Sequence, residues 1–295
     1  MKSEIQYIKR ADLDEEKYMA CLDKSSNALI YAYPWYLDIV CDDWAILMYD
    51  DYKAVMPIPY LKLKRHLWQK KIYMPEMTQQ LGIFHIDKLR LDLNEQFYDT
   101  LIQLNPNTYH FNYDTLNIEV VGKQIVSSKN NYEIELFDSY DSIYNTYTKS
   151  LKRQLKKAKR NNLVIRNDIK VADFLKMRRK HVPFKVSNKQ QKIYNKLFIF
   201  LTRNKIAKIY GIYQSGELIA AEIVLFFSDR IILLSSFNSL KGRDLGAILF
   251  FRDYILKEYS GKRYILDFAG SMIPSVAKFH RNFGAKNRPY PCVQS

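Results

Sequence analysis

The chain has 295 residues, which is enough for one large or two ordinary domains. Hydrophobic residues make up 47% of it, and with nine glycines and nine prolines the composition excludes a disordered or fibrous chain. The formal net charge of +15 favours a phosphate-bearing partner such as a cofactor, a nucleic acid or an anionic lipid surface, although a basic surface with no special partner accounts for it equally well.

Cysteine usage and hydropathy favour a cytoplasmic protein. The three cysteines, Cys21, Cys41 and Cys292, are scattered and odd in number, which argues against a disulfide framework or a metal knuckle. No apolar run reaches the roughly 18 residues that a membrane span needs. The first sixteen residues are too charged for a secretion signal. We therefore expect no transmembrane segment, and an association with the surface of a membrane is left open.

The first part of the chain alternates short strands, helices and loops. In chain order, the pattern predicts a strand at 4–10, a helix at 12–24 capped by Asp12, a short aromatic helix or turn at 33–41, a hairpin at 44–63 with Asp50-Asp51 at its tip, a loop at 66–84, a helix at 93–104, a strand at 107–115, a loop at 122–131 and a strand at 132–137. Pro57 and Pro59 mark the second hairpin strand as an edge or a bulge.

A helix that begins near Tyr140 becomes strongly basic along its length. At 100° per residue, Tyr147, Leu151, Leu155 and Ala158 share one narrow face. The opposite face is cationic and consists of Lys149, Lys152, Arg153, Lys156 and Arg160, flanked by Lys157 and Lys159. Such a run of charges is usually the solvated face of an amphipathic helix. However, seven cations without an interleaved acid exceed what solubility requires, so a surface for polyphosphate or nucleic acid is plausible.

The remaining elements form a regular α+β succession. They are a strand at 163–168, helices at 169–182 and 189–204, three antiparallel strands at 206–213, 218–227 and 230–238, a glycine-marked turn into a helix that starts near Asp244, a strand at 263–271, a helix at 276–285 and a strand at 290–294. The first half has a similar but more broken order. We therefore expect two α+β domains, 1–139 and 140–295.

The sequence lacks the patterns of common hydrolases. There is no G-x-S-x-G motif, the five histidines are scattered, and no spacing suits a metal. We therefore expect neither a Ser-His-Asp hydrolase nor a zinc hydrolase, and no metal.

The helix start near Asp244 is one candidate site. It follows Gly242 and Arg243 and includes Gly246. A helix N-terminus offers unpaired N–H groups, and glycines let a phosphate approach the backbone. Two alternatives stay open at this point: the glycines serve a tight turn, and Asp244, which would repel a phosphate, caps the helix.

The strand ends at 235–238 and 266–271 form a second candidate site. Where a strand order changes from antiparallel to parallel, neighbouring strands can separate and expose backbone groups to an extended, amide-bearing ligand. Asp267 lies near the end of an apolar strand. It is a candidate general base or acceptor for a substrate amine, and the alternatives are a helix cap or an ion pair with an arginine.

From Ile206 onward, the order of elements resembles the GNAT acyltransferase fold, and more narrowly its Fem-type branch, which includes the peptidoglycan aminoacyltransferases. Three stretches carry the resemblance. SLKRQLKKAKRNNLVI (150–165) resembles the Arg/Lys-rich helix of the branch, LDFAGS (266–271) its Asp-x-x-Gly strand end, and KFHRNFGA (278–285) its helix ending in Phe-Gly. The resemblance implies two tandem GNAT-like domains, each a mixed, mostly antiparallel sheet flanked by helices.

The resemblance also implies transfer of an acyl group to an amine without a covalent enzyme intermediate. The donor would be acyl-CoA or an aminoacyl-tRNA, and no cofactor would be covalently bound. Asp267, or alternatively Glu222, would take the proton, while N–H groups near Phe237 and Asn238 would polarise the donor carbonyl. The implied donor-binding residues are Phe237, Asn238, Gly242, Arg243, Gly246 and Ala247. The implied substrate- or phosphate-binding residues are Lys152, Arg153, Lys156, Lys157, Arg160, Ser271 and Lys278.

One departure from the GNAT pattern separates the possible donors. The GNAT pyrophosphate loop usually reads Gln/Arg-x-x-Gly-x-Gly/Ala, whereas this chain has Ile248 in the last place. A degenerate loop is expected in Fem aminoacyltransferases, whose donor is aminoacyl-tRNA, but the coiled-coil arm that some members carry is missing. The alternatives to a CoA-dependent enzyme are therefore an aminoacyl-tRNA-dependent transferase acting on a cell-wall precursor, and a non-catalytic protein that binds nucleic acid or an anionic surface.

Overall fold

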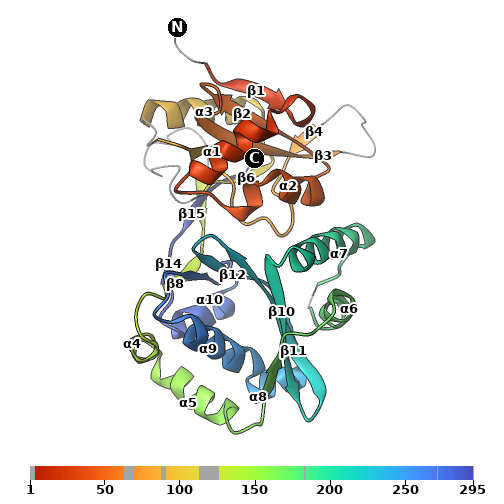
Figure 1. The fold of residues 1–295 in the computed structure, drawn as a ribbon, viewed down its shortest axis with the longest axis vertical. Helices are drawn as coiled ribbons and strands as arrows, with labels where there is room; N and C mark the ends of the chain where they lie inside the picture. Colours follow the sequence, from red (N-terminus) through yellow and green to blue (C-terminus); the bar gives the residue numbers. More distant parts are fainter. Residues whose placement is uncertain are drawn as a thin grey trace. The chain divides into compact units, whose positions relative to one another are not determined.

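A computed structural model of the protein describes residues 4–62, 70–87, 91–112, 126–182, 184–270 and 272–294. The chain divides into two compact units (Figure 1). Unit 1 comprises Met1–Lys129 and Pro289–Ser295, and unit 2 comprises Asn130–Arg288. Both are built on mixed or antiparallel sheets flanked by helices, as the sequence predicts.

Unit 1 contains two sheets. Its strands are β1 (Gln6–Lys9), β2 (Asp43–Tyr49), β3 (Ala54–Lys62), β4 (Lys70–Ile72), β5 (Phe84–His85), β6 (Thr108–His110), β7 (Val126–Lys129) and β15 (Tyr290–Gln294). Its helices are η1 (Arg10–Asp12), α1 (Glu15–Lys24), η2 (Ile30–Ala32), α2 (Pro34–Val40) and α3 (Leu91–Gln103). One sheet has the order β1-β2-β3-β4 with β5 also on β3, and the other has the order β6-β15-β7.

The two prolines of β3 lie where the strand has a partner on one side only. Among the described residues, β5 pairs with β3 at Ala54 and Val55, and β4 pairs with it from Tyr60 onward. Pro57 and Pro59 lie between these two paired segments and pair with β2 on the other side, and on the β4 side the Pro59 carbonyl oxygen still accepts a hydrogen bond of 3.3 Å from the Tyr73 N–H. A proline lacks the N–H that a second ladder would need, so the local edge predicted from the sequence is confirmed.

Three details of unit 1 differ from the sequence predictions. Helix α1 is capped by Asp14, which accepts a hydrogen bond from the Lys17 N–H, while Asp12 belongs to the preceding 3₁₀ turn. The loop expected at 122–131 contains strand β7. The end of the strand expected at 107–115 lies outside the described residues. The sequence offers both Asp12 and Asp14 as caps, and the folded chain selects Asp14. Strand β7 is polar and was not recognisable as a strand without its partner β15.

The C-terminal strand belongs to unit 1. Strand β15 lies between β6 and β7 and pairs antiparallel with both. Strand β8 (Tyr132–Glu135) belongs instead to unit 2, where it pairs with β13 and β14. The division therefore differs from the boundary expected at 139/140, because strand pairing, rather than sequence order, decides which unit a terminal segment joins.

Unit 2 is built on one seven-stranded sheet with the order β14-β8-β13-β12-β11-β10-β9. Its other strands are β9 (Val164–Arg166), β10 (Ala207–Gln214), β11 (Glu217–Phe227), β12 (Arg230–Asn238), β13 (Ile265–Asp267) and β14 (Lys286–Asn287). Its helices are α4 (Tyr140–Asn145), α5 (Lys149–Ala158), α6 (Val171–His181), α7 (Asn188–Arg203), α8 (Leu240–Leu245), α9 (Ala247–Tyr259) and α10 (Pro274–Asn282). Strands β10, β11 and β12 pair antiparallel and β13 pairs parallel with β12, so the predicted succession of three antiparallel strands, helix and parallel strand is confirmed.

Helices cover both faces of this sheet (Figure 1). On one face α9 packs against β10 and β11, with the rings of Tyr210 and Phe251 5.2 Å apart. On the other face α6 packs against β12, where Phe174 contacts Phe237 at 5.9 Å between ring centroids. The strands are therefore buried on both sides, which accounts for their nearly continuous apolar sequences.

Helix α5 has the two faces predicted from its sequence. Tyr147, Leu151, Leu155 and Ala158 are all at most 3% exposed and belong to the core beneath α9. Thr148 caps the helix by accepting a hydrogen bond from the Leu151 N–H. The basic side chains are directed away from this core, so the burial of one apolar stripe fixes the position of the cationic surface.

Candidate functional site

Strand β12 has a free backbone edge over its second half. Strand β13 pairs with it only from Arg230 to Ile232, and from Leu233 to Asn238 its only strand partner among the described residues is β11. The register also shifts, because Val224 pairs with Leu233 while Ile223 pairs with Ser235. Leu234 is thus an extra residue in a β-bulge. An extended ligand with amide groups can pair with such an edge.

The bulge changes which side chains of β12 face which helices. Before it, Leu233 is buried in the core that contains α9. After it, Ser235 and Phe237 face α6: the Ser235 hydroxyl accepts a hydrogen bond from Arg178 Nε at 2.8 Å, and His181 stacks on Phe237. The Phe237 side chain is therefore buried, and only its backbone can meet a ligand. Asn238 consequently faces the opposite side, toward the junction of α8 and α9.

Gly246 separates α8 from α9. Its φ of 72° ends α8 and opens α9, so the single helix expected to start near Asp244 is in fact two helices, and Ser239 rather than Asp244 caps the first of them. A Cβ on Gly246 would lie 3.1 Å from Cβ of Ala158. Both the left-handed backbone and the close approach of α5 favour glycine here. The first N–H groups of α9 have no carbonyl partner within that helix.

The C-terminal end of α5 is fixed against this turn. Asn161 Nδ2 donates a hydrogen bond of 2.9 Å to the Leu245 carbonyl oxygen, and Ala158 contacts Gly246. This contact places Gln154 and Lys157, near the end of the helix, beside the start of α9. The two candidate phosphate sites inferred separately from the sequence are therefore neighbours in the structure.

A cavity of about 440 Å³, here named the Gly246 pocket, lies at this junction. It is lined by Gln154, Lys157, Ala158, Asn238, Arg243, Asp244, Leu245, Gly246, Ile248, Leu249 and Phe279. Four of the predicted site residues thus meet in one place: Lys157, Asn238, Arg243 and Gly246. Gly242 and Ala247 do not line the pocket. Gly242 is instead a packing position, because a Cβ there would lie 2.4 Å from Oδ1 of Asn238.

The other side of α5 forms a second, more basic hollow of about 610 Å³, here named the α5 groove. Its lining consists of Tyr144, Lys152, Arg153, Leu155, Lys156, Lys159 and Arg160. Lys159 forms an ion pair with Asp253 at 3.2 Å, and the Lys152 ammonium lies 4.9 Å from the centre of the Tyr144 ring. Within the described part of the chain, Arg153, Lys156 and Arg160 form no ion pair. The basic residues of α5 therefore serve two separate surfaces.

Asp267 lies in a buried ionic network. Its carboxylate is 3.1 Å from Arg230 Nη1, which also contacts Glu133 at 2.7 Å, and it accepts a hydrogen bond from the Ala269 N–H at 2.8 Å. Burial raises the pKa of Asp267 from 3.8 to about 6, against the lowering effect of Arg230 and with a further rise from Glu133. Asp267 thus forms the ion pair with an arginine that the sequence left as one alternative. Its pKa lies about one unit below neutral pH.

Glu222 also has a buried arginine partner, on the other face of the sheet. It contacts Arg252 Nη2 at 3.0 Å, and the guanidinium carbon lies 5.3 and 5.2 Å from the ring centres of Phe268 and Phe279. Glu222 shares a strand face with Val224, which belongs to the α9 core, whereas Asp267 pairs with Ile232 on the opposite face. The two candidate bases therefore cannot act on the same atom from the same side.

The remaining predicted residues contribute less to this site. Ser271 lies outside the described residues. Lys278 is exposed on α10 and lines none of these cavities, whereas its neighbour Phe279 lines the Gly246 pocket. Gln154, Leu249 and Phe279 were missed by the sequence analysis. Gln154 and Lys157 are three residues apart on one side of α5, and this spacing is the sequence signal that could have paired them. The described residues contain no cluster of side chains suited to a metal ion and no helix that could span a bilayer.

Comparison of the whole chain with solved structures decides the fold. The chain resembles FemX with a TM-score of 0.61 and 8% identity, covering 97% of this chain and 96% of FemX. It resembles a tandem GNAT protein from the clavulanic acid biosynthesis pathway with a TM-score of 0.54 and 11% identity, covering 98% and 97% of the two chains. The chain has the Fem-type tandem GNAT fold.

A third structure with this tandem GNAT likeness is a C-terminal domain described as that of a putative lysylphosphatidylglycerol synthetase from Agrobacterium fabrum. Its TM-score is 0.56 at 10% identity, and the match covers 96% of this chain and 92% of that domain. No protein-family model and no curated protein sequence matches the chain.

Proposed function

We propose that unit 2 is an N-acyltransferase that takes its acyl group from acyl-CoA and transfers it to an amine. The observation that carries the proposal is the Gly246 pocket. There the end of β12, the first turn of α9 and the basic side chains Lys157 and Arg243 come together around one cavity. Each of these features suits a different part of a donor that has both phosphates and amides.

The phosphates would be held by charge and by backbone donors. Lys157 from α5 and Arg243 from α8 line the pocket, and Gly246, Ile248 and Leu249 bring the start of α9, with its unpaired N–H groups, to the same wall. Asp244 also lines the pocket and opposes an anion, so two cations and a helix terminus act against one carboxylate. The amide-bearing arm of the donor would pair with β12 beyond Leu233, where no strand other than β11 does among the described residues.

The chemical step would be a direct attack. The acceptor amine forms a C–N bond to the thioester carbonyl carbon, the C–S bond breaks, the amine loses a proton to a base, and the thiolate leaves and is protonated. Backbone N–H groups near Phe237 and Asn238 on the β12 edge would stabilise the oxyanion. Of the two candidate bases we favour Asp267, because a pKa of about 6 leaves it ionised at neutral pH and basic enough to accept a proton.

Binding of CoA and acetyl-CoA tests this proposal. Isothermal titration should give saturable binding to the wild-type protein, weakened about tenfold in Lys157→Met and in Arg243→Met, because each change removes a charge-assisted phosphate contact. Lys156→Met is the matched control, since Lys156 is on the same helix but lines the α5 groove. Wild-type protein that binds neither CoA nor acetyl-CoA would rule out the proposed donor.

The α5 groove favours a second candidate, in which the donor is an aminoacyl-tRNA. Its five basic residues, four of them without an ion pair in the described structure, suit a nucleic-acid backbone better than a single pyrophosphate. In that case tRNA binding should weaken steeply with salt. Neutralising Lys156 and Arg160 together should reduce the slope of log binding constant against log salt concentration by about two, because two phosphate contacts are lost. A flat salt response would exclude this donor, and binding to anionic vesicles in place of tRNA would assign the groove to a membrane surface.

A further inference from the structure

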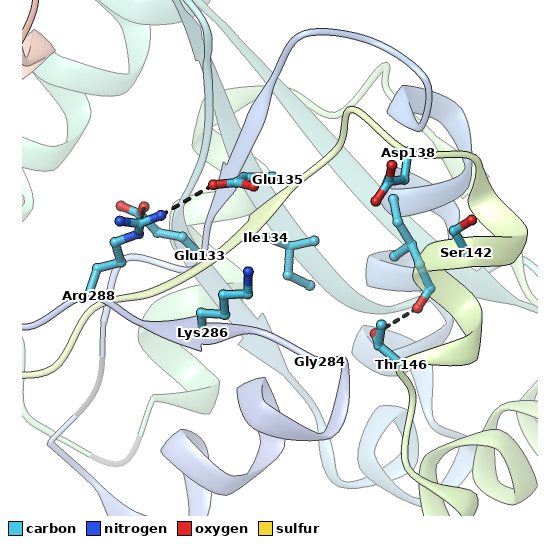
Figure 2. A pocket seen from close by; sticks show the side chains of 10 residues that line it. Glu133, Ile134, Glu135, Asp138, Ser142, Thr146, Gly284, Lys286 and Arg288 are labelled. Carbon is cyan, nitrogen blue, oxygen red and sulfur yellow. Dashed lines mark hydrogen bonds and ion pairs between the residues drawn. The ribbon is translucent and has the colours of Figure 1, made fainter.

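A third cavity in unit 2, separate from both basic surfaces, lies at the edge of the sheet. Strand β14 pairs with β8 only at Tyr132 and Glu133, and the chain before β14 turns away toward α10. The gap between β8, α4 and the Gly284 turn encloses about 140 Å³ and is named the Gly284 pocket. Its polar lining consists of Glu133, Glu135, Asp138, Ser142, Thr146, Lys286 and Arg288 (Figure 2). It shares no residue with the Gly246 pocket or the α5 groove.

The walls of the Gly284 pocket are held by close packing. A Cβ on Gly284 would lie 2.0 Å from Oγ1 of Thr146, and the φ of 81° favours glycine there independently. The Thr146 hydroxyl donates a hydrogen bond of 3.3 Å to the Phe283 carbonyl oxygen, and the Thr148 N–H donates to the Asn282 carbonyl oxygen. These contacts join the end of α4 to the end of α10, so the pocket has a fixed shape.

Most charges at the pocket neutralise one another. Arg288 contacts Glu135 at 3.2 Å and Oε2 of Glu133 at 3.8 Å. Glu133 is only 5% exposed, and its other oxygen contacts Arg230 at 2.7 Å. Two opposite charges are then left over. Asp138 and Lys286 are exposed and form no ion pair within the described residues, and Figure 2 shows them on either side of Ile134.

We propose that the Gly284 pocket binds a small zwitterion, a free α-amino acid. Asp138 would accept hydrogen bonds from its ammonium group, and Lys286 would contact its carboxylate. A ligand with only one charge would leave one of these two side chains without a partner. The volume is well below the roughly 300 Å³ at which pockets for drug-sized ligands begin, so a small side chain is expected.

Three related ligands test the proposal on the full-length protein. L-alanine carries both charges, N-acetyl-L-alanine lacks the ammonium, and L-alaninamide lacks the carboxylate. Titrations followed by NMR chemical shifts should show binding of L-alanine about fivefold tighter than that of either derivative, the size expected for one exposed ion pair. Asp138→Asn should abolish the preference over N-acetyl-L-alanine, and Lys286→Met should abolish the preference over L-alaninamide.

Two matched variants serve as controls. Asp141→Asn and Lys196→Met remove exposed charges of the same types that do not line the pocket, and both should leave all three affinities unchanged. The proposal is wrong if L-alanine does not bind saturably, or if it binds equally well to Asp138→Asn and Lys286→Met variants that remain folded by circular dichroism. CoA should not compete with L-alanine, so this result does not depend on the proposed acyl donor.

Discussion

Asp267 combines a buried ion pair with a pKa near neutrality, and these two properties have separate consequences. If it is the base, kcat/KM should fall about tenfold per pH unit below pH 6, because the protonated carboxyl cannot accept a proton. Asp267→Asn should lower the rate by about a hundredfold or more and remove this acid limb. The measurement is a pH–rate profile on the best amine acceptor.

Glu133→Gln provides the comparison for Asp267. Glu133 raises the pKa of Asp267 and shares Arg230 with it, so its neutralisation should move the acid limb to lower pH without abolishing activity. An Asp267→Asn profile that matches the wild type would show that Asp267 is purely structural. The folded-state pKa exceeds the ordinary value of 3.8, so its titration favours folding at low pH, and this contribution is lost as the pH rises through about 6.

His280 affects the pH dependence of stability in the opposite direction to Asp267. It is 1% exposed, neither ring nitrogen has a hydrogen-bond partner among the described residues, and burial with the nearby Arg252 lowers its pKa to about 3. The unfolded chain therefore binds a proton that the folded chain does not, and stability is lost as the pH falls below 6.5. At pH 5 this costs about 2 kcal/mol, and His280→Phe should recover it.

Hydrogen exchange is the suitable measurement for His280, because all three tryptophans, Trp35, Trp44 and Trp68, belong to unit 1. The most protected amides of α9 and β12 should gain more protection from His280→Phe at pH 5 than at pH 8 once intrinsic exchange rates are corrected. An equal gain at both pH values would mean that the substitution acts through packing alone. The ring of Phe268, 4.8 Å away, makes a phenylalanine compatible with the site.

At the scale of elements, the contact of α5 with the α8–α9 junction determines the site. Gly246→Ala should destabilise unit 2 for two reasons, a strained φ of 72° and a Cβ 3.1 Å from Ala158. Gly216→Ala in the β10–β11 turn has the same strain at φ 81° but no neighbour within 4 Å, and so should cost only about 1 kcal/mol. The difference between the two losses in unfolding free energy measures the cost of the close contact between a Cβ at position 246 and Ala158.

A second substitution separates crowding from strain. In the Gly246→Ala background, Ala158→Gly removes the opposing methyl group and should recover the crowding part after correction for the lower helix propensity of glycine. CoA affinity should follow the same order, because the junction positions Lys157 and Arg243. Equal costs at Gly246 and Gly216 would show that α5 can withdraw without penalty. Urea unfolding followed by circular dichroism gives the free energies.

At the scale of the whole molecule, the C-terminal segment completes a unit that begins at the other end of the chain. Truncation after Arg288 removes β15, and with it the buried side chains of Tyr290, Cys292 and Val293. Burial of such side chains stabilises by roughly 1.5–3 kcal/mol each, so unit 1 should be severely destabilised. Unit 2 should remain folded, since no strand of its sheet is removed.

Fluorescence and hydrogen exchange together test this truncation. Tryptophan emission, which reports unit 1, should shift to the red, while the amides of β10, β11 and β12 stay protected. Deletion of Ser295 alone is the control, because it leaves β15 complete. Persistent native fluorescence after removal of β15 would show that β6 and β7 do not need the strand between them.

The sequence by itself determined the periodic elements and the chemistry that each could carry. The apolar stripe of α5, the three antiparallel strands and the following helix and parallel strand were all predictable, because helical and strand periods are local properties of the chain. The glycine at 246 was visible in the sequence, but the pattern predicted one helix through it, and only the structure shows the left-handed turn that separates α8 from α9 there. These features were sufficient to suggest the GNAT fold.

Only the tertiary structure decided which residues share a site. It placed Lys157 in one cavity and Lys156 in another, although they are adjacent in sequence, because one residue on a helix rotates a side chain by about 100°. It also moved Asn238 into the Gly246 pocket through a bulge, and put Glu222 and Asp267 on opposite faces of the sheet. Register and pairing are contacts between distant segments, so no local pattern encodes them.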